Sequence, residues 1–534
     1  MTKTTTKKQQ PATVSVVAAG PGDASLVTVR AMEALANAAH IITDTTVQHI
    51  AREYARDDAE ITVAAEKSGQ PLPQADITRL VVEAAKTGAP TVRLLAGDPV
   101  FDGTLLSEVN GLRRSKLNFE VIPGISEITG VPAYAGFGLT GGKVHDVHVV
   151  DATAKDINYA ALVEPARTLV FRHGADHVAA ITAGLLRAGM AEDTPIAITR
   201  DGTTVDQRTM VSTIGDAAAV TKAAKFAGPG IVVVGDVIDQ REKLNWFETK
   251  ALVGWRILIP RTQDNTAEVM SLLRGHGAVP LEVPTISVEP PRTPQQMDRA
   301  IHGLVSGRFE WIGFTSVNAV RAIREKLVEY GLDARSFAGL KVAAVGDQAI
   351  EALIEFGVRP DLVPSGEPTT SALLEEWPAY DSLTDPINRV FLPRADIATD
   401  TLAAGLAELG WEVEDITAYR TVRAAPPAAD IRESIKTGGF DAVLFTSSST
   451  VRNLVGIAGK PHHTTVVACI GPQTAKTAEE HGLRVDVMPT TSTVLALVDA
   501  LAAHGAELRA AALEAGEVSW RPSRKRPPSR RKTT

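Results

Sequence analysis

Short apolar runs that resemble buried strands alternate with helical stretches from residue 13 to about residue 504. A regular alternation of this kind predicts an α/β fold along the whole chain. Because 534 residues exceed what one hydrophobic core usually holds, we expect several domains. In the first half, strands are expected at residues 13–19, 40–43, 91–96, 119–122, 144–150, 167–172, 195–199 and 230–234.

The pattern restarts near residue 250 with a strand-like stretch at 256–262, RILIPRT. A helix is expected next, with Asn265 as its N-cap and Glu268 as the capping-box partner. Gly275 or Gly277 would end this helix. We therefore expect a disordered arm, a first α/β domain, a second α/β domain of two lobes, and a C-terminal extension with a disordered basic tail. Their expected ranges are residues 1–12, 13–250, 251–505 and 506–534.

The second half contains an internal repeat. Residues 309–320 read FEWIGFTSVNAV and residues 440–451 read FDAVLFTSSSTV. After each motif comes a second strand that ends at a glycine, Gly346 or Gly471, and leads into another helix. Two copies are too few for a solenoid, so the repeat predicts two similar α/β lobes facing a cleft.

The composition argues against several classes of protein. No apolar run reaches the length of a membrane span, and the polar N-terminus lacks the apolar segment of a secretory signal. The single cysteine, Cys469, lies in an apolar run, and the twelve histidines form no HExxH or comparable pattern. We therefore expect no disulfide, no metal, no membrane association and a location in the reducing cytoplasm.

Charge is unevenly distributed along the chain. The formal net charge is −8, yet residues 521–534 carry seven basic residues and no acidic one. The prolines and the lack of apolar residues in this stretch predict disorder. Such a tail is either simply solvated or makes a weak electrostatic contact with a polyanion. Nucleic-acid binding is not expected as the main function.

A rigid glycine turn, Gly20-Pro21-Gly22-Asp23, follows the first expected strand. Glycines there let the backbone approach a ligand, and the next helix offers free N–H groups, although the turn by itself is equally well explained as structural. Four further stretches accompany it: LLAGDPVF (94–101), FEVIPGISEITGVPAYAGFGLT (119–140), TPIAITRDGTTVDQR (194–208) and GIVVVGDV (230–237). In this order they resemble the tetrapyrrole methylase family, specifically uroporphyrinogen-III C-methyltransferase.

This resemblance implies two α/β subdomains that bind S-adenosylmethionine, a homodimer, and double methylation of uroporphyrinogen III to precorrin-2. It also implies that Asp44 accepts a proton and that Lys67 donates one. A carboxylate suits the chemistry, because a pyrrolic ring carbon must lose a proton as it gains a methyl group. The residues expected to bind the cofactor are Pro21, Gly97, Asp98, Phe101, Ser126, Glu127, His173 and Gly202.

Three stretches depart from the family's pattern. The tyrosine and arginine that usually flank the aspartate are absent from Thr43-Asp44-Thr45-Thr46. A glycine-arginine-glycine run is replaced by residues 102–105, DGTL, and LTHR is replaced by LTGG at 139–142. Arginines of this kind would grip a substrate with eight carboxylates. The first half therefore either methylates uroporphyrinogen III or keeps only a binding or dimerising role.

The second half resembles uroporphyrinogen-III synthase. The matching stretches are RILIPRT, FTSVNAV, FTSSSTV, residues 342–364, residues 389–422 and residues 470–483. The resemblance implies a two-lobed fold with a cleft for a linear tetrapyrrole and no cofactor. It further implies cyclisation of hydroxymethylbilane with inversion of its last pyrrole ring. Because this substrate loses its own terminal hydroxyl, the protein need only fold the chain and assist proton transfer.

Polar residues at strand ends are the candidates for this second site. Tyr419 is expected to donate a proton to the leaving hydroxyl, and Thr474 is the second catalytic candidate. Tyr419 equally suits packing at a strand edge, the Ser/Thr turns equally suit helix capping, and Arg394 equally suits a strand end. The residues expected to bind substrate carboxylates are Arg261, Ser316, Asn318, Arg394, Thr446, Ser447 and Ser448.

The leading interpretation is a bifunctional enzyme, because the product of a synthase of this kind is the substrate of the methyltransferase. The alternative is a synthase whose methylase-like domain is catalytically degenerate and binds S-adenosylmethionine or dimerises. A third interpretation, a polyanion-binding protein that acts through its basic tail, ranks below both.

Overall fold

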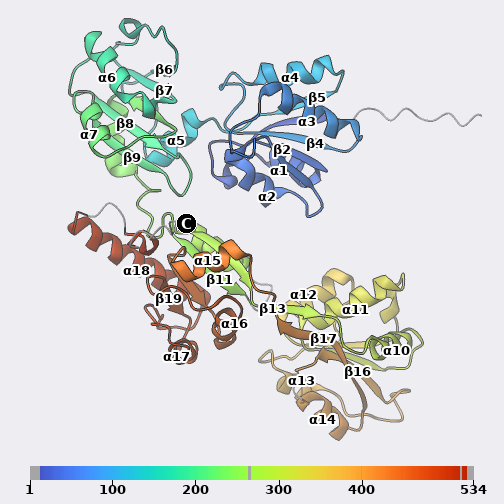
Figure 1. Ribbon diagram of the computed structural model, residues 1–534. Helices are drawn as coiled ribbons and strands as arrows, with labels where there is room; N and C mark the ends of the chain where they lie inside the picture. The colour runs from blue at the N-terminus through green and yellow to red at the C-terminus, as the bar shows by residue number, and fades with distance from the viewer. Residues whose placement is uncertain (1–12, 262–265, 398–399, 517–519, 526–534) are drawn as a thin grey trace, which may run out of the picture. The chain divides into compact units, whose positions relative to one another are not determined.

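The structure is a computed structural model that describes residues 13–261, 266–397, 400–516 and 520–525 (Figure 1). The expected arm at 1–12, the expected N-cap Asn265 and residues 526–534 of the basic tail lie outside the described residues. The chain forms two compact units. Unit 1 contains the chain up to Trp255 with residues 271–279 and 502–520, and unit 2 contains residues 256–270, 280–501 and the chain from Arg521.

Unit 1 begins with a five-stranded parallel sheet of order β3-β2-β4-β1-β5. Helices α1 and α2 cover one face of this sheet, and α3 and α4 cover the other. Because all five strands run the same way, the loops that follow them meet at one edge. The strands are β1 Val14–Ala18, β2 His40–Thr43, β3 Glu60–Val63, β4 Thr91–Leu95 and β5 Phe119–Ile122. The helices are α1 Val29–Asn37, α2 Gln48–Tyr54, α3 Gln74–Lys86 and α4 Leu105–Arg114.

A second, mixed sheet of order β6-β7-β10-β8-β9 completes the body of unit 1. Helix α5 packs on one face, and α6 and α7 pack on the other. The strands are β6 Asp146–Asp151, β7 Arg167–Arg172, β8 Pro195–Arg200, β9 Arg208–Thr213 and β10 Gly230–Val234. The helices are α5 Glu127–Ala135, α6 Val178–Arg187, α7 Ala217–Ala223 and the short α8 Arg241–Leu244.

Unit 2 consists of two lobes, as its repeat predicts. Lobe A is a sheet of order β12-β11-β18-β19 with α15, α16 and α17 on one face. Its strands are β11 Arg256–Arg261, β12 Val279–Pro284, β18 Ala442–Phe445 and β19 Val466–Cys469. The helices of this part of the chain are α9 Ala267–Gly275, α15 Ala429–Thr437, α16 Ser448–Ala458, α17 Pro472–Glu480 and α18 Val494–Glu514.

Lobe B is a sheet of order β13-β17-β16-β14-β15, covered by α10, α11 and α12 on one face and by α13 and α14 on the other. Its strands are β13 Ile286–Glu289, β14 Trp311–Phe314, β15 Lys341–Ala344, β16 Arg389–Ala395 and β17 Glu412–Arg423. Its helices are α10 Pro294–Val305, α11 Val317–Glu329, α12 Asp347–Phe356, α13 Thr370–Glu376 and α14 Thr401–Glu408.

The repeat in the sequence is a repeat in three dimensions. The succession β14-α11-β15-α12 in lobe B recurs as β18-α16-β19-α17 in lobe A. Each copy then brings an aspartate back to its second strand. Asp361 Oδ2 accepts a hydrogen bond of 2.7 Å from the Val342 amide, and Asp486 Oδ2 accepts one of 2.9 Å from the Val467 amide. In both lobes the residue after the aspartate forms a parallel bridge with the strand, so the repeat includes this return segment.

The C-terminal segment differs from the expectation. Helix α18 runs through residue 505, where the second domain was expected to end. The first described residues of the expected disordered tail are packed, because Arg521 Nη2 lies 3.4 Å from Asp441 Oδ2 and the Ser523 amide donates to Asp441 Oδ1 at 2.8 Å. Asp441 is fully buried and needs such partners to offset its lost hydration. Charge composition alone could not reveal this buried acceptor.

The aspartates of the repeat generate a test of the fold. Replacing Asp486 by alanine leaves the Val467 amide without its acceptor in a nearly buried position, which costs roughly 1–3 kcal/mol. We expect a lower melting temperature in differential scanning calorimetry of Asp486→Ala. The control is Asp333→Ala, which removes an exposed aspartate that caps only a short 3₁₀ turn. Equal melting temperatures for the two variants would contradict this assignment.

Candidate functional sites

The glycine-rich loops of unit 1 come together at the carboxyl edge of its first sheet. Gly20 and Gly97 exchange backbone hydrogen bonds of 3.2 and 3.1 Å, which join the loops after β1 and β4. A Cβ on Gly130, in α5, would lie 2.9 Å from Pro21 Cγ. A Cβ on Gly202 would lie 2.3 Å from a valine side chain of α5. Only glycine permits these approaches, so the predicted loop residues are held together by close backbone packing.

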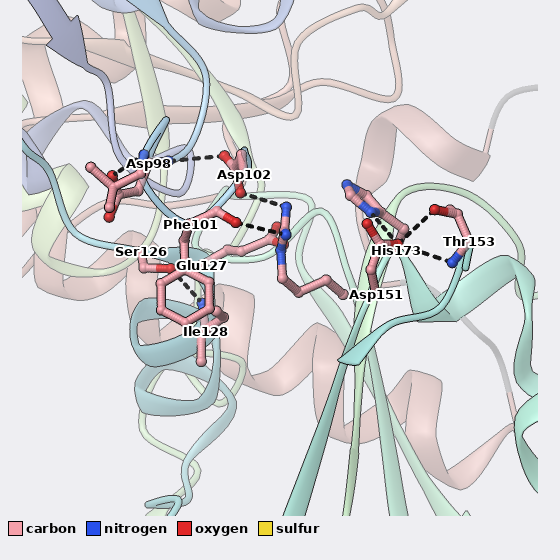
Figure 2. Close-up of polar contacts among 11 residues, drawn as sticks. Asp98, Phe101, Asp102, Ser126, Glu127, Ile128, Asp151, Thr153 and His173 are labelled. Carbon is pink, nitrogen blue, oxygen red and sulfur yellow. Dashed lines mark hydrogen bonds and ion pairs between the residues drawn. The ribbon is translucent and has the colours of Figure 1, made fainter. Parts of the chain in front are cut away.

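An arginine at the end of β7 holds two of these loops in place. Arg172 Nη2 donates to Asp102 Oδ1 at 2.6 Å, and Nη1 donates to the Phe101 carbonyl at 2.9 Å. Its Nε lies 3.5 Å from Glu127 Oε1. Figure 2 shows the Asp102 carboxyl group and the Phe101 backbone carbonyl joined to this contact by dashed lines, with the Phe101 ring pointing away from it. The sequence interpretation missed Arg172, although a charged residue at the end of the apolar stretch TLVF was a visible signal.

Burial dominates the electrostatics of these two carboxyl groups. It raises the pKa of Asp102, and the neighbouring Arg172 guanidinium only partly opposes this. Burial also raises the pKa of Glu127, and the charge of Asp102 raises it further against the opposing effect of Arg172. The Arg172 side chain is 8% exposed, and those of Asp102 and Glu127 are 21% and 29% exposed, so a buried guanidinium lies between two partly buried carboxyl groups. The pKa of each carboxyl group therefore depends on the charge of its neighbours in the cluster.

Two more expected cofactor residues have local structural contacts. Ser126 caps α5, because its hydroxyl accepts a hydrogen bond of 3.3 Å from the Ile128 amide. The Asp98 amide donates to Asp102 Oδ2 at 3.1 Å, and Asp98 Oδ1 accepts from the Val100 amide at 3.1 Å (Figure 2). These contacts shape the loop while leaving the neighbouring Phe101 ring 48% exposed.

His173 follows Arg172 in a left-handed backbone conformation, with φ of 54°. Its Nδ1 lies 3.4 Å from Asp151 Oδ1 at the end of β6 (Figure 2). Hydrogen bonds from the hydroxyl and amide of Thr153 lower the pKa of Asp151 to about 2. Asp151 is thus a negative partner for His173 that the sequence interpretation did not identify.

The expected proton acceptor, Asp44, is engaged at both of its oxygens. Oδ1 accepts from Arg93 Nη2 at 2.6 Å, and Oδ2 accepts from the Ala96 amide at 3.0 Å. Arg93 is buried and also binds Glu108, so Asp44 joins the ends of β2 and β4. The expected donor Lys67 is exposed in the loop after β3. No ion pair between Lys67 and Asp44 is found among the described residues.

Unit 2 contains a cavity of about 1440 Å³, lined by residues of both lobes. Four of the residues predicted for the second site line it: Arg261, Ser316, Asn318 and Tyr419. The first turn of α12 contributes Gly346, Asp347 and Gln348, and α16 of lobe A contributes Ser449 and Asn453. Asn318 and Ser449 occupy equivalent positions of the repeated FTSxxxV motif, so both copies contribute to the wall.

The other predicted residues of unit 2 are not among those that line the cavity. Ser447 and Thr450 form a capping box at the start of α16, and Ser448 donates to the Gln473 carbonyl at 3.1 Å. Thr474 is buried in α17, and Thr446 lies at the end of β18. Arg394 forms ion pairs with Asp400 and Asp415. In this structure Ser447 therefore has the role of a helix cap, and Arg394 has the role of an ion-pairing residue at a strand end.

A β-bulge sets the position of Tyr419 in the cavity wall. The register between β16 and β17 shifts after Arg394, so that Ala395 lies opposite Tyr419 rather than Ala418. Such a bulge changes the direction of the following side chains. The Tyr419 ring is 7% exposed and belongs to the core of lobe B, and its hydroxyl lies 2.9 Å from Ser316 Oγ.

A cationic residue that the sequence interpretation missed, Arg423, also lines the cavity. It ends β17, four residues after Tyr419. A Cβ on Gly456 of α16 would lie 2.9 Å from Arg423 Nη1, so the glycine leaves room for the guanidinium. Within the described part of the chain, no ion pair involves Arg423. The signal available was its position in the stretch AYRTVR beside the predicted tyrosine.

Neither a membrane span nor a metal centre emerges from the residues that the structure describes. None of the helices searched is both long and apolar enough to cross a bilayer. Likewise, no group of three or more histidine, cysteine or acidic side chains in the described ranges is arranged to hold a metal ion.

Comparison with known proteins identifies relatives of both halves and of the whole. A family model for tetrapyrrole (corrin/porphyrin) methylases matches residues 13–218, and one for uroporphyrinogen-III synthase HemD matches residues 267–499. The porphyrin biosynthesis protein HemD of Ruminiclostridium josui is 30% identical over 500 residues, which cover 91% of this chain and 97% of that protein. The siroheme synthase of Pseudomonas putida strain W619 is 37% identical over 247 residues, covering 45% of this chain and 53% of its own length.

Two solved structures each match one half. One is a uroporphyrin-III C-methyltransferase from Thermus thermophilus in complex with S-adenosylhomocysteine, which is 26% identical with a TM-score of 0.36. That match covers 42% of this chain and 99% of the structure. The other is a mutant uroporphyrinogen III synthase, also from Thermus thermophilus, which is 20% identical with a TM-score of 0.32. That match covers 48% of this chain and 99% of the structure.

The cluster around Arg172 predicts a pH-dependent stability. In Arg172→Met the carboxyl groups of Asp102 and Glu127 lose their cation, and because these groups are only partly buried the loss costs roughly 1–3 kcal/mol. The pKa values of both carboxyl groups are already raised and rise further once Arg172 is removed. As the pH falls, protonation removes their uncompensated negative charge, so the variant loses less stability. We expect the variant's melting temperature to drop more at about pH 8 than at about pH 5.

Arg335→Gln is the control, because its ion pair with Asp333 is exposed and should contribute little at either pH. A loss in Arg172→Met that is the same at both pH values would contradict the assignment.

Proposed function

The chain belongs to the porphyrin biosynthesis protein HemD family, and on this premise we propose that its two domains catalyse consecutive steps of tetrapyrrole biosynthesis. Unit 2 cyclises hydroxymethylbilane to uroporphyrinogen III with inversion of the last ring. Unit 1 transfers methyl groups from S-adenosylmethionine to that product, giving precorrin-2. The proposal includes a homodimer joined through unit 1 and a location in the cytoplasm.

The cavity of unit 2 is the observation that carries the synthase reaction. Its volume of about 1440 Å³ exceeds the roughly 300–1,000 Å³ typical of drug-sized ligand sites, which suits a substrate of four linked pyrroles. Its wall offers hydroxyl and amide groups together with Arg261 and Arg423. Such donors suit a ligand rich in carboxylates.

Proton transfer is the chemistry that the wall of the cavity must supply. As the bond between the terminal carbon and its hydroxyl breaks, Tyr419 donates a proton and the hydroxyl leaves as water. The positive charge that remains is delocalised in the substrate as an azafulvene, which the substituted carbon of the last pyrrole attacks. This attack gives a spiro intermediate, because the attacking carbon keeps its bond to the bridge from the neighbouring pyrrole. That older bond then breaks and re-forms at the unsubstituted α-carbon of the same ring, which inverts the ring. The unsubstituted carbon loses its proton to the Tyr419 oxygen, so the ring regains its conjugation and the tyrosine is regenerated. The walls keep the chain folded for this closure.

The loops of unit 1 fit the methyl donor proposed for them. A Cβ on Gly97 or Gly202 would lie 2.3 Å from a neighbouring side chain, Gly20 has a positive φ of 80°, and the uncovered Phe101 ring is part of the Gly97 loop. Exposed peptide groups suit the polar ends of S-adenosylmethionine, and the ring suits its apolar part. When bound, this molecule supplies an electrophilic methyl group. In the same proposal Asp44 accepts the ring proton and Lys67 lies near the substrate.

One observation favours a second function for unit 1. Both Asp44 oxygens already bind Arg93 and a backbone amide, which gives this carboxylate a structural role. Unit 1 would then bind S-adenosylmethionine or dimerise without methylating, and the chain would act as a synthase alone.

Freshly generated hydroxymethylbilane separates these possibilities. With the intact protein we expect the type III isomer without S-adenosylmethionine and a dimethylated product with it, as separated by chromatography and mass spectrometry. The type III isomer without methylation in either case would support the second function of unit 1. Type I isomer alone, formed by spontaneous closure, would refute the synthase proposal.

Arg423 provides a separate test of the cavity. Removing its guanidinium in Arg423→Gln deletes a charge-assisted contact to a substrate carboxylate, so the synthase KM should rise roughly tenfold with little change in kcat. Arg389→Gln is a matched control, since Arg389 lies in the same sheet but pairs with Glu412 outside the cavity. An unchanged KM in Arg423→Gln would exclude Arg423 from substrate binding.

A further inference from the structure

We infer that Ser316 is a positioning residue that directs the proton of Tyr419 into the cavity. This inference rests on the proposed synthase function of unit 2. Ser316 Oγ lies 2.9 Å from the Tyr419 hydroxyl, and both side chains line the cavity. Among the described residues, Ser316 is the hydrogen-bond partner of that hydroxyl. The contact therefore lies where it can affect proton transfer by the Tyr419 hydroxyl.

Either hydroxyl can donate in this contact, and in this inference Ser316 is the donor. Its Oγ accepts a hydrogen bond of 3.2 Å from the Ala319 amide at the start of α11. This cap uses one of the two acceptor sites of Ser316 and leaves its own O–H proton available for donation to Tyr419. Donation to the Tyr419 oxygen leaves the phenolic proton free of Ser316, so it can point toward a leaving group in the cavity.

The same arrangement stabilises the tyrosine after it has given up its proton. Negative charge then develops on the phenolic oxygen, which accepts the hydrogen bond from Ser316. That oxygen lies at the N-terminus of α11, a helix of 13 residues whose partial positive charge favours an anion. Ser316 therefore connects the helix terminus to the reacting group.

The backbone and the core of lobe B keep Tyr419 in this contact. The bulge after Arg394 places Tyr419 opposite Ala395, and the Asp396 amide donates to the Tyr419 carbonyl at 3.1 Å. With the ring packed in the core, the hydroxyl has little freedom to seek another partner.

The repeat provides an internal comparison. Ser447 of lobe A caps α16 as Ser316 caps α11, but its hydroxyl lies 2.8 Å from Ser449 Oγ, and no tyrosine of the described chain contacts it. Capping alone thus explains a serine at this position of the motif in both lobes. The contact with Tyr419 is specific to lobe B, and it is this contact that we assign to catalysis.

The test is a double-mutant cycle of Ser316→Ala and Tyr419→Phe in the full chain, with hydroxymethylbilane as substrate. Ser316→Ala should lower the synthase kcat roughly tenfold with little change in KM, because an interaction made in the transition state is lost. In the Tyr419→Phe background the same substitution should have no further effect on kcat. Ser316→Thr, which keeps the hydroxyl, should restore most of the rate.

Two variants separate this role from helix capping. Thr369→Ala removes a comparable N-cap of α13, also in lobe B but outside the cavity, and should leave kcat unchanged. Ser316→Asp keeps a side chain that caps helices well but has no proton to donate when ionised. Its carboxylate would take the phenolic proton as an acceptor, so kcat should fall and the pH optimum should change while the melting temperature is kept.

The outcomes distinguish failure of this inference from failure of the proposed function. A full rate in Tyr419→Phe overturns the proton donor and the inference together. A slow Tyr419→Phe in which Ser316→Ala causes a further, equal loss overturns the inference alone. A rise in KM without a change in kcat for Ser316→Ala, or an unchanged kcat and pH profile for Ser316→Asp, also overturns it.

Discussion

Parallel strand pairing is the constraint on which the functional architecture depends. Two parallel strands cannot be joined by a tight turn, so each connection must cross back over the sheet, here through a helix. Every loop that follows such a strand then lies at the same edge. In unit 1 this brings the turns after β1 and β4 into backbone contact through Gly20 and Gly97. In unit 2 it places the N-termini of α11 and α12 together in the wall of one cavity.

The sites occupy these edges with residues that also have structural roles. Ser316 and Ser126 each cap a helix, Asp44 joins two strand ends, and Arg172 links two loops through its ion pairs. Such double roles pre-orient the site, since a group with fixed structural partners already has its position before a substrate binds. They also mean that substitutions at these positions alter stability and chemistry together. Matched caps and ion pairs elsewhere in the chain are therefore necessary for comparison.

Local sequence patterns were sufficient to predict much of the fold. β2, β5, β7 and β10 occupy the predicted residues, because each is a central or well-patterned apolar run. The strands β3 and β9 were missed because EITV and RTMVST contain only two apolar residues each, whereas the equally peripheral β5, FEVI, contains three. The Ser/Thr turns were predicted as helix starts, and Ser316 and Ser447 are N-caps. Arg172 and Arg423 were missed because their significance depends on residues distant in sequence, such as Asp102 and Gly456.

The buried carboxylate of Asp441 has a consequence for how the chain folds during synthesis. It receives hydrogen bonds from the Arg256 amide, at the first residue of unit 2, and from the Ser523 amide, among the last described residues. Its ion-pair partner Arg521 also comes after every other described element of lobe A. Lobe A therefore stays incomplete on the ribosome until these residues emerge, while lobe B and both sheets of unit 1 have already been made. Long-range closure of this kind is slow to form, so this lobe should be the last to become resistant to proteolysis.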